Sequence, residues 1–291
     1  MFEKILFPTD LTRVTNSLLF AVKEFREYGT KELVIVHAIE HDPETLVEAG
    51  VDMDNFITKL RSKAEQKLEE IKKELEAYFK VSAIVVPTTN VAETISTVAN
   101  EVNASLLVFG SKGKKAAIMG STAENLVRIS KVPSLVVRTK PEYGTGYYET
   151  LFKNLFNKVL VACFDGCDGK SLKIAKNGKE IILLHVAELD AVLESKVEKE
   201  KLIHPLVPIP RVTEILSEYW MDAKDKLDKI KNELENEGKN VKIIIRFGSP
   251  ETEIGKAATS EGASLIIVTA EKLGHMDLVV RNSEAPVLIL K

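Results

Sequence analysis

The two halves of this 291-residue chain carry the same succession of short motifs. Three pairs of segments show the repeat: residues 4–10 and 158–165, residues 34–38 and 182–186, and residues 132–137 and 285–290. The matching segments keep their order, and each lies about half the chain length further on. A repeat of this length indicates a duplicated domain, because solenoids repeat every few tens of residues.

Each half alternates short runs of Val, Ile and Leu with longer amphipathic stretches, which predicts a parallel sheet covered on both faces by helices. Strands are expected near residues 4–8, 33–38, 82–86, 105–109 and 134–138, then near 158–163, 180–186, 241–246, 264–268 and 286–290. Helices are expected over Thr15–Tyr28, Asp54–Phe79, Val91–Val102 and Ser121–Ile129, then over Ser171–Lys176 and Val212–Leu234. The predicted fold class is α/β, with two tandem five-stranded parallel-sheet domains.

The expected division places one domain at residues 1–140, a linker at 141–156 and a second, degenerate domain at 157–291. Pro141, Gly144 and Gly146 mark the linker, since Pro and Gly interrupt regular structure. A short helix over Phe152–Phe156 is expected to lead into the second domain.

Apolar residues make up 45% of the chain and charged residues 29%, with a net charge of −3. This balance is typical of a globular protein and provides no basic surface for nucleic acid. The sequence shows no signal peptide and no membrane span, so we expect a cytoplasmic protein without a membrane partner. The two cysteines, Cys163 and Cys167, are expected to be one buried and one loop residue. Redox sensing by this pair is the less favoured alternative.

A glycine-rich segment follows the fourth predicted strand. The apolar run Leu106–Phe109 ends at Gly110, and a helical pattern with Leu126 and Ile129 on its apolar face comes afterwards. The segment between them supplies Gly110, Gly113, Gly120, Ser121 and Thr122. Glycines admit an anion to the backbone N–H groups, and the helix N-terminus adds partial positive charge. The segment therefore favours a phosphate site; an ordinary strand-to-helix connection is the alternative.

Several of these motifs resemble the universal stress protein family in a tandem form, over nearly the whole chain. They are KILFPTD at 4–10, Val36-His37-Ala38, Gly110-Ser-Lys-Gly113, Gly120-Ser121-Thr122, VPSLVV at 132–137 and FGSPETEI at 247–254. The resemblance implies the strand order 3-2-1-4-5 of adenine nucleotide alpha hydrolase-like folds, and two domains related by a pseudo-twofold axis. The family dimerises through its last strand, so residues 133–138 and 286–290 are expected at the domain interface.

The strand order reverses between strands 1 and 4, and ligands of such sheets bind beyond the carboxyl ends of the strands at the reversal. The resemblance implies that Asp10, with Pro8 and Thr9 beside it, meets the adenosine end of a nucleotide. It implies that the backbone of Ala38 bonds the adenine edge. Ribose and phosphates would be surrounded by Gly110, Gly113, Gly120, Ser121 and Thr122. Helix capping is the alternative role for Asp10.

ATP-binding members of the family use a Gly-x2-Gly-x9-Gly-Ser/Thr loop, whereas this chain has Gly110-x2-Gly113-x6-Gly120-Ser121. Three residues correspond to roughly 4.5 Å of helix rise, which changes the geometry at the terminal phosphates. The expected ligand is therefore ATP, ADP or AMP, with or without Mg²⁺. The corresponding second-half segment, Thr269–Asp277, keeps only Gly274, so we expect one nucleotide per chain, bound in the first half.

Two functions remain open. The favoured one is an adenine-nucleotide-binding stress protein with little or no catalysis, at most weak ATP hydrolysis. The other is a nucleotide-free scaffold that acts through protein–protein contacts. A homodimer or another protein is the expected partner in either case. No catalytic residue is predicted, and no metal ligand, since His37 and His41 lie at a strand end and lack the helical spacing of paired zinc ligands.

Overall fold

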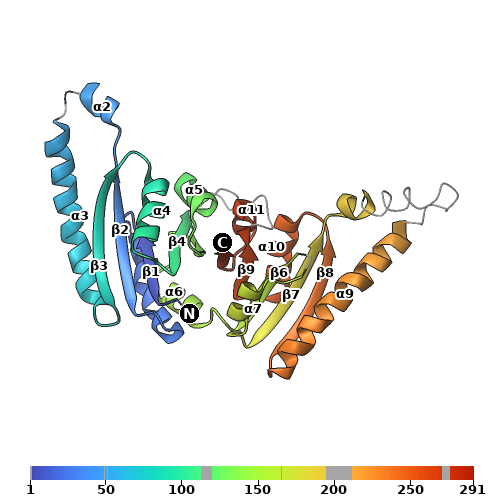
Figure 1. Cartoon of the computed structure of the whole chain (residues 1–291). Helices are drawn as coiled ribbons and strands as arrows, with labels where there is room; N and C mark the ends of the chain where they lie inside the picture. The colour runs from blue at the N-terminus through green and yellow to red at the C-terminus, as the bar shows by residue number, and fades with distance from the viewer. Residues whose placement is uncertain are drawn as a thin grey trace. The chain divides into compact units, whose positions relative to one another are not determined.

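A computed structural model describes residues 2–48, 50, 52–112, 120–164, 166–194, 212–270 and 276–291. The chain forms two compact units, residues 1–154 together with Lys291, and Leu155–Leu290 (Figure 1). Each unit contributes five strands, and each is described by itself below.

The first unit is built on five parallel strands. They are β1 (Lys4–Pro8), β2 (Glu32–Glu40), β3 (Lys80–Thr88), β4 (Leu106–Lys112) and β5 (Ser134–Thr139). Their order in the sheet is β3-β2-β1-β4-β5, which confirms the predicted 3-2-1-4-5 order. The central strand β1 carries Ile5, Leu6 and Phe7, all fully buried, as expected of a strand covered on both faces.

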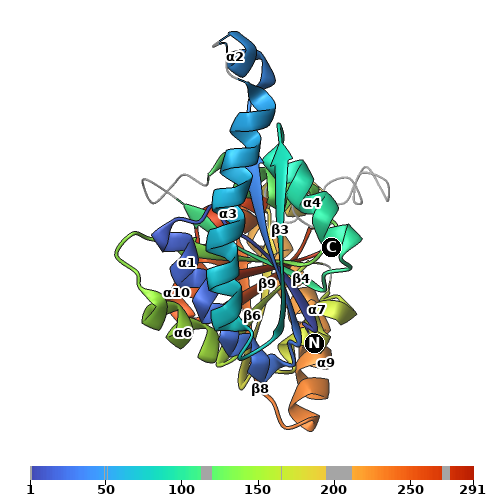
Figure 2. The same ribbon diagram turned by 90° about the vertical axis from the view of Figure 1, so that its left-hand side faces the viewer.

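Helices cover both faces of this sheet. They are α1 (Arg13–Ala21), the 3₁₀ helix η1 (Val22–Tyr28), α2 (Pro43–Glu48), α3 (Met53–Leu75), α4 (Val91–Glu101), α5 (Ser121–Ile129) and α6 (Thr145–Lys153). Helices α1 and α6 contact each other, as do α4 and α5. Figure 2 shows α1 and α4 on opposite sides of the sheet. Along α5, Leu126 is buried as predicted, but Ile129 is 40% exposed.

The segment predicted as a linker contains the helix α6, which packs on the first unit. Tyr148 and Phe152 are fully buried, and the Phe152 ring lies 4.9 Å from the Phe25 ring, edge to face. The Tyr28 hydroxyl donates a 2.6 Å hydrogen bond to the Phe152 carbonyl oxygen. Burial raises the pKa of Tyr148 to about 12. Apolar side chains spaced four apart on a helix therefore bind this segment to the α1 side of the first unit.

The second unit repeats the fold. Its strands are β6 (Lys158–Cys163), β7 (Glu180–Ala187), β8 (Asn240–Phe247), β9 (Leu265–Thr269) and β10 (Val287–Leu290), in the parallel order β8-β7-β6-β9-β10. Its helices include α7 (Gly169–Ala175), α9 (Val212–Asn236), α10 (Pro250–Glu261) and α11 (Met276–Arg281). No helix of the described residues is long and apolar enough to cross a membrane.

A serine hydroxyl joins the first and fourth strands at the amino end of each sheet. In the first unit, the Lys4 N–H donates to Ser105 Oγ over 3.0 Å, and this hydroxyl donates to the Lys4 carbonyl oxygen over 2.9 Å. In the second unit, Ser264 makes the same two contacts with Lys158, at 2.8 and 3.0 Å. The duplication is therefore visible in individual hydrogen bonds.

We expect Ser105→Ala to destabilise the first unit by about 1–2 kcal/mol, because the partly buried Lys4 N–H loses its acceptor, whereas the Lys4 carbonyl oxygen still accepts from the backbone N–H of residue 105. Ser264→Ala should do the same to the second unit. Urea unfolding, followed by amide exchange of each unit, measures both effects. Ser105→Thr keeps the hydroxyl and is the matched control. Equal stability of Ser105→Ala and the unmodified protein would contradict this role.

Candidate functional site

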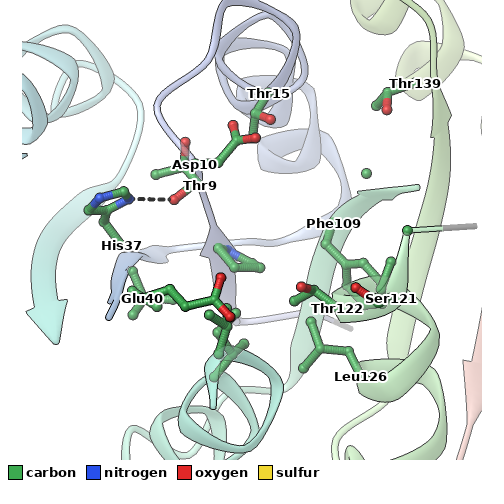
Figure 3. Close-up of a pocket in the computed structure, with 18 residues that line it drawn as sticks. Thr9, Asp10, Thr15, His37, Glu40, Phe109, Ser121, Thr122, Leu126 and Thr139 are labelled. Carbon is green, nitrogen blue, oxygen red and sulfur yellow. Dashed lines mark hydrogen bonds between the residues drawn. The ribbon is translucent and has the colours of Figure 1, made fainter. Parts of the chain in front are cut away.

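A cavity of 340 Å³ lies at the carboxyl edge of the first unit, where β1 and β4 end and the strand order reverses (Figure 3). It falls within the range of about 300–1,000 Å³ that small-molecule sites occupy. Its apolar lining includes Val36, Val91, Ile95, Phe109 and Leu126. Its polar lining includes Thr15, His37, Glu40 and Thr139. The cavity thus combines an apolar slot with a few converging polar groups.

Eight of the nine residues predicted for a ligand site line this one cavity. They are Pro8, Thr9, Asp10, Ala38, Gly110, Gly120, Ser121 and Thr122. The ninth, Gly113, lies outside the described residues. Four separate segments of the sequence meet here because the carboxyl ends of parallel strands lie along one edge of the sheet.

Sequence reasoning missed Glu40, whose carboxylate points into the cavity between His37 and Thr122 in Figure 3. A signal for it was present. Side chains two apart on a strand share a face, so Val36, Ala38 and Glu40 of β2 point to the same side. Once Ala38 is placed in a site, the period of the strand places the other two there as well.

The turn after β1 presents Thr9 and Asp10 to the cavity. Asp10 Oδ1 accepts hydrogen bonds from the Thr12 N–H, at 3.0 Å, and from the Thr12 hydroxyl, at 2.7 Å. The N-cap of α1 is Thr12, whose side chain accepts from the Thr15 N–H. The alternative that Asp10 itself caps the first helix is therefore wrong. Asp10 holds the capping residue in place through its Oδ1.

The N-terminus of α5 forms the wall opposite β2. Its N-cap is Gly120, which has no side chain to accept from the N–H groups of the first turn. These N–H groups and the hydroxyls of Ser121 and Thr122 can therefore bind acceptor atoms of a ligand, and the helix dipole favours an anion. The preceding strand was expected to end at Gly110, but β4 continues to Lys112 and pairs with β5 up to Thr139.

Gly110 is a point of close approach between β4 and β5. A Cβ atom at this position would lie 2.6 Å from Thr139 Cγ2 and 3.5 Å from Leu18 Cδ2. Thr139 is buried, and its hydroxyl donates to the Ser111 carbonyl oxygen over 3.2 Å. Glycine is needed here because any side chain would push Thr139, which itself lines the cavity.

The corresponding edge of the second unit carries a cluster of three polar side chains. Asp168 Oδ2 accepts from the hydroxyls of Ser171 and Thr269, the latter at 2.6 Å. Burial raises the pKa of Asp168, but the hydrogen bonds from Ser171 and Thr269 outweigh it and hold the pKa below its ordinary value. The carboxylate is therefore ionised at neutral pH. By strand register, Thr269 stands where the first unit has Gly110.

The two cysteines form a disulfide that spans the turn after β6, from Cys163 to Cys167. The expectation of one buried and one loop cysteine is confirmed, and the bond between them was not predicted. Cys163 is indeed fully buried as the last residue of β6. The disulfide closes a loop of few residues, so it constrains this turn and not the fold as a whole.

Asp165 and Gly274 lie outside the described residues.

Comparison with known proteins agrees with this architecture. The model of the universal stress protein family matches residues 1–138 and 169–291. Universal stress protein MJ0577 of Methanocaldococcus jannaschii is 33% identical over 158 residues, covering 48% of this chain and 97% of that protein. Universal stress protein Sll1654 of Synechocystis is 27% identical over 146 residues, covering 47% of this chain and 86% of that protein.

Among solved structures, a universal stress protein from Archaeoglobus fulgidus covers 99% of this chain and 96% of its own, with a TM-score of 0.67. The sequence identity is 22%, so this likeness concerns the fold alone. A parallel sheet whose strand order reverses at a cavity, present in the first unit, is characteristic of doubly wound α/β folds, in which ligands bind at the reversal. The chain belongs to the universal stress protein family, whose model matches most of both units.

Proposed function

We propose that the first unit binds an adenine nucleotide, ATP, ADP or AMP, and that the protein acts as a regulatory binding protein. The observation that carries this proposal is the convergence of eight separately predicted residues on one cavity at the reversal of the strand order. This is where ligands of such sheets bind. The proposal assigns the base to the β2 side of the cavity and the phosphates to the α5 side.

The β2 side fits a flat heteroaromatic base. Val36, Ile95 and Phe109 provide apolar surface, and the backbone of Ala38 can bond the edge of the base. Asp10 and Glu40 can accept hydrogen bonds from the amino group of a base or the hydroxyls of a ribose. The two carboxylates, Asp10 and Glu40, repel a further anion nearby, so the phosphates belong at the opposite wall.

The α5 side fits a phosphate. The first-turn N–H groups of a helix and two hydroxyls are the donors that phosphate oxygens accept from, and Gly120 leaves the backbone accessible. The shortened glycine loop supports AMP or ADP beside ATP, because the helix begins about one turn earlier than in the longer loop. Mg²⁺ would accompany ADP or ATP through phosphate oxygens, as it commonly does in nucleotide sites.

Calorimetric titration of the full chain with ATP, ADP and AMP, each with and without Mg²⁺, tests the proposal. We expect saturable binding of at least one of them, and much weaker binding of GTP, which offers an oxo group where adenine has its amino group. Lack of binding by all three adenine nucleotides, in protein freed of any co-purified nucleotide, would instead support the nucleotide-free scaffold.

The same titration should give one nucleotide per chain. In the second unit, the Asp168 carboxylate and the Thr269 side chain stand at the edge where the first unit has Gly110 and its cavity. An ionised carboxylate repels phosphate, so this polar cluster disfavours a nucleotide at the edge of the second unit. Native mass spectrometry checks the stoichiometry independently. Two equivalent nucleotides per chain would show that the second unit is also a site.

Hydrolysis is a separate question from binding. Asp10 Oδ1 already accepts from Thr12, which suits a positioning role better than that of a general base. We therefore expect phosphate release from ATP to be slow relative to nucleotide exchange. A phosphate-release assay on the protein and on Asp10→Asn separates intrinsic hydrolysis from a contaminating ATPase.

A further inference from the structure

His37 holds the peptide of Thr9 from the neighbouring strand. Its Nδ1 lies 2.8 Å from the Thr9 carbonyl oxygen, as the dashed line in Figure 3 shows. A carbonyl oxygen only accepts, so Nδ1 carries the proton of this bond. The Thr9 N–H donates to the Val36 carbonyl oxygen over 2.9 Å. Val36 and His37 are consecutive in β2, and they bond the N–H and the carbonyl oxygen of Thr9 respectively.

The turn that follows Thr9 is strained. Leu11 has a φ of +57°, which a residue with a branched side chain rarely adopts. Local bonds support the turn: the Leu11 N–H donates to Thr9 Oγ1 over 3.0 Å, and the Thr12 N–H donates to Asp10 Oδ1 over 3.0 Å. A strained conformation persists only where its surroundings hold it from several sides. The bond from His37 adds support from another strand, through a side chain.

The second unit provides an internal comparison. His185 Nδ1 lies 3.0 Å from the Cys163 carbonyl oxygen, in the same arrangement. There, however, the positive φ of the turn falls on a glycine, Gly166 at +110°, and the disulfide to Cys167 constrains the loop. His185 is buried, and its Nε2 accepts from the Tyr219 hydroxyl over 2.8 Å. This histidine therefore joins core elements, and the positive φ described in the turn beside it lies on a glycine, where it costs little.

We propose that His37 is a positioning residue of the nucleotide site: its Nδ1–H bond to the Thr9 carbonyl keeps the strained Thr9–Leu11 turn in the conformation that presents Asp10 to the ligand. The proposal rests on the proposed function for its effect on affinity. Its effect on the turn does not depend on any ligand. The equivalent histidine of the second unit has kept the bond and serves packing.

The binding test compares His37→Leu, which removes the donor, with His37→Asn, whose side-chain amide can donate from nearly the position of Nδ1. Titration with AMP and with ATP should show about tenfold weaker binding for His37→Leu, as expected for the loss of one hydrogen bond that holds a strained turn. His37→Asn should recover most of the affinity. His185→Leu should lower the thermal midpoint and leave the affinity unchanged.

Amide exchange gives a readout that needs no nucleotide. The N–H groups of Leu11 and Thr12 should exchange faster in His37→Leu, and at nearly the original rate in His37→Asn and in His185→Leu. Unchanged exchange at both amides in His37→Leu would overturn the proposal, whatever the affinity does. If the unmodified protein binds no nucleotide, the proposed function fails, and the exchange rates still decide whether His37 holds the turn. Equal affinity of His37→Leu and the unmodified protein would overturn the link to binding.

Discussion

Replacing Gly110 by threonine should weaken nucleotide binding at least about a hundredfold, which is the largest effect on affinity that we expect from one substitution. The substitution copies into the first unit the residue that the second unit carries at this position. The new Cβ would approach Thr139 Cγ2 to 2.6 Å, so the buried Thr139 must move within the cavity wall. Titration with ATP and AMP measures the loss.

A double substitution shows whether the clash is the cause. Gly110→Ala alone should weaken binding, and Gly110→Ala together with Thr139→Ala should restore much of it, because the threonine methyl and hydroxyl that Cβ meets are then gone. Additive losses in this cycle would contradict the steric explanation. Circular dichroism of each variant must match the unmodified protein before the affinities are compared.

Gly255→Ala should destabilise the second unit by about 3 kcal/mol, the largest effect on stability that we expect from adding one methyl group. Gly255 lies in α10, and a Cβ atom there would stand 2.3 Å from the backbone carbonyl oxygen of Asn282, just after α11. A backbone atom cannot rotate away as a side chain can. The two helices must therefore separate, and urea unfolding of the second unit measures the cost.

Gly169→Ala is the matched control for this substitution. Gly169 begins α7 in the same unit, its φ is not positive, and a Cβ atom added to it would enter open space. Alanine should be neutral or slightly stabilising there, because it restricts the unfolded chain without a clash. A similar loss of stability in both variants would mean that the close approach to Asn282 is not what matters.

The strands were predictable because buried parallel strands are continuous runs of Val, Ile and Leu. The expected positions agree with β1, β6 and β7 to within one residue at each end. The strand order needed the family resemblance, since the pattern of apolar residues does not say which strands pair. The first helix was expected to run unbroken to Tyr28, but it changes to a 3₁₀ helix at Val22. The buried residues Val22 and Phe25 are three apart, a spacing that fits both helix types, so the apolar pattern of this short segment cannot separate them.

The helix α6 was missed because its segment opens with Pro141, Gly144 and Gly146, which normally interrupt structure. Gly144 turns out to be the N-cap, where glycine is tolerated, and the helix depends on the tertiary contacts of Tyr148 and Phe152. The continuation of β4 past Gly110 was missed for a similar reason. A glycine can end a strand or allow close packing within it, and only the position of Thr139 distinguishes the two.

For the candidate site, sequence motifs identified the segments, and the sheet brought them together. Glu40 could have been found from the two-residue period of β2. The contact of His37 with the Thr9 carbonyl could not, because it depends on the register of β1 against β2 and on the rotamer of the ring. The polar cluster around Asp168 could not be predicted from the sequence either, since its member Thr269 lies 101 residues further along the chain.

The serine hydrogen bonds at the amino ends of β1 and β6 indicate which parts of a duplicated domain can diverge in sequence. Both units keep the same two hydrogen bonds there, through Ser105 and Ser264. Their carboxyl edges have diverged: the first unit has a cavity, and the second has the polar cluster around Asp168. When hydrogen bonds at the amino edge stabilise the sheet, side chains at the carboxyl edge can change without loss of folding. The second unit is therefore a suitable place to engineer a new ligand specificity, because changes at its carboxyl edge would spare both the shared framework and the cavity of the first copy.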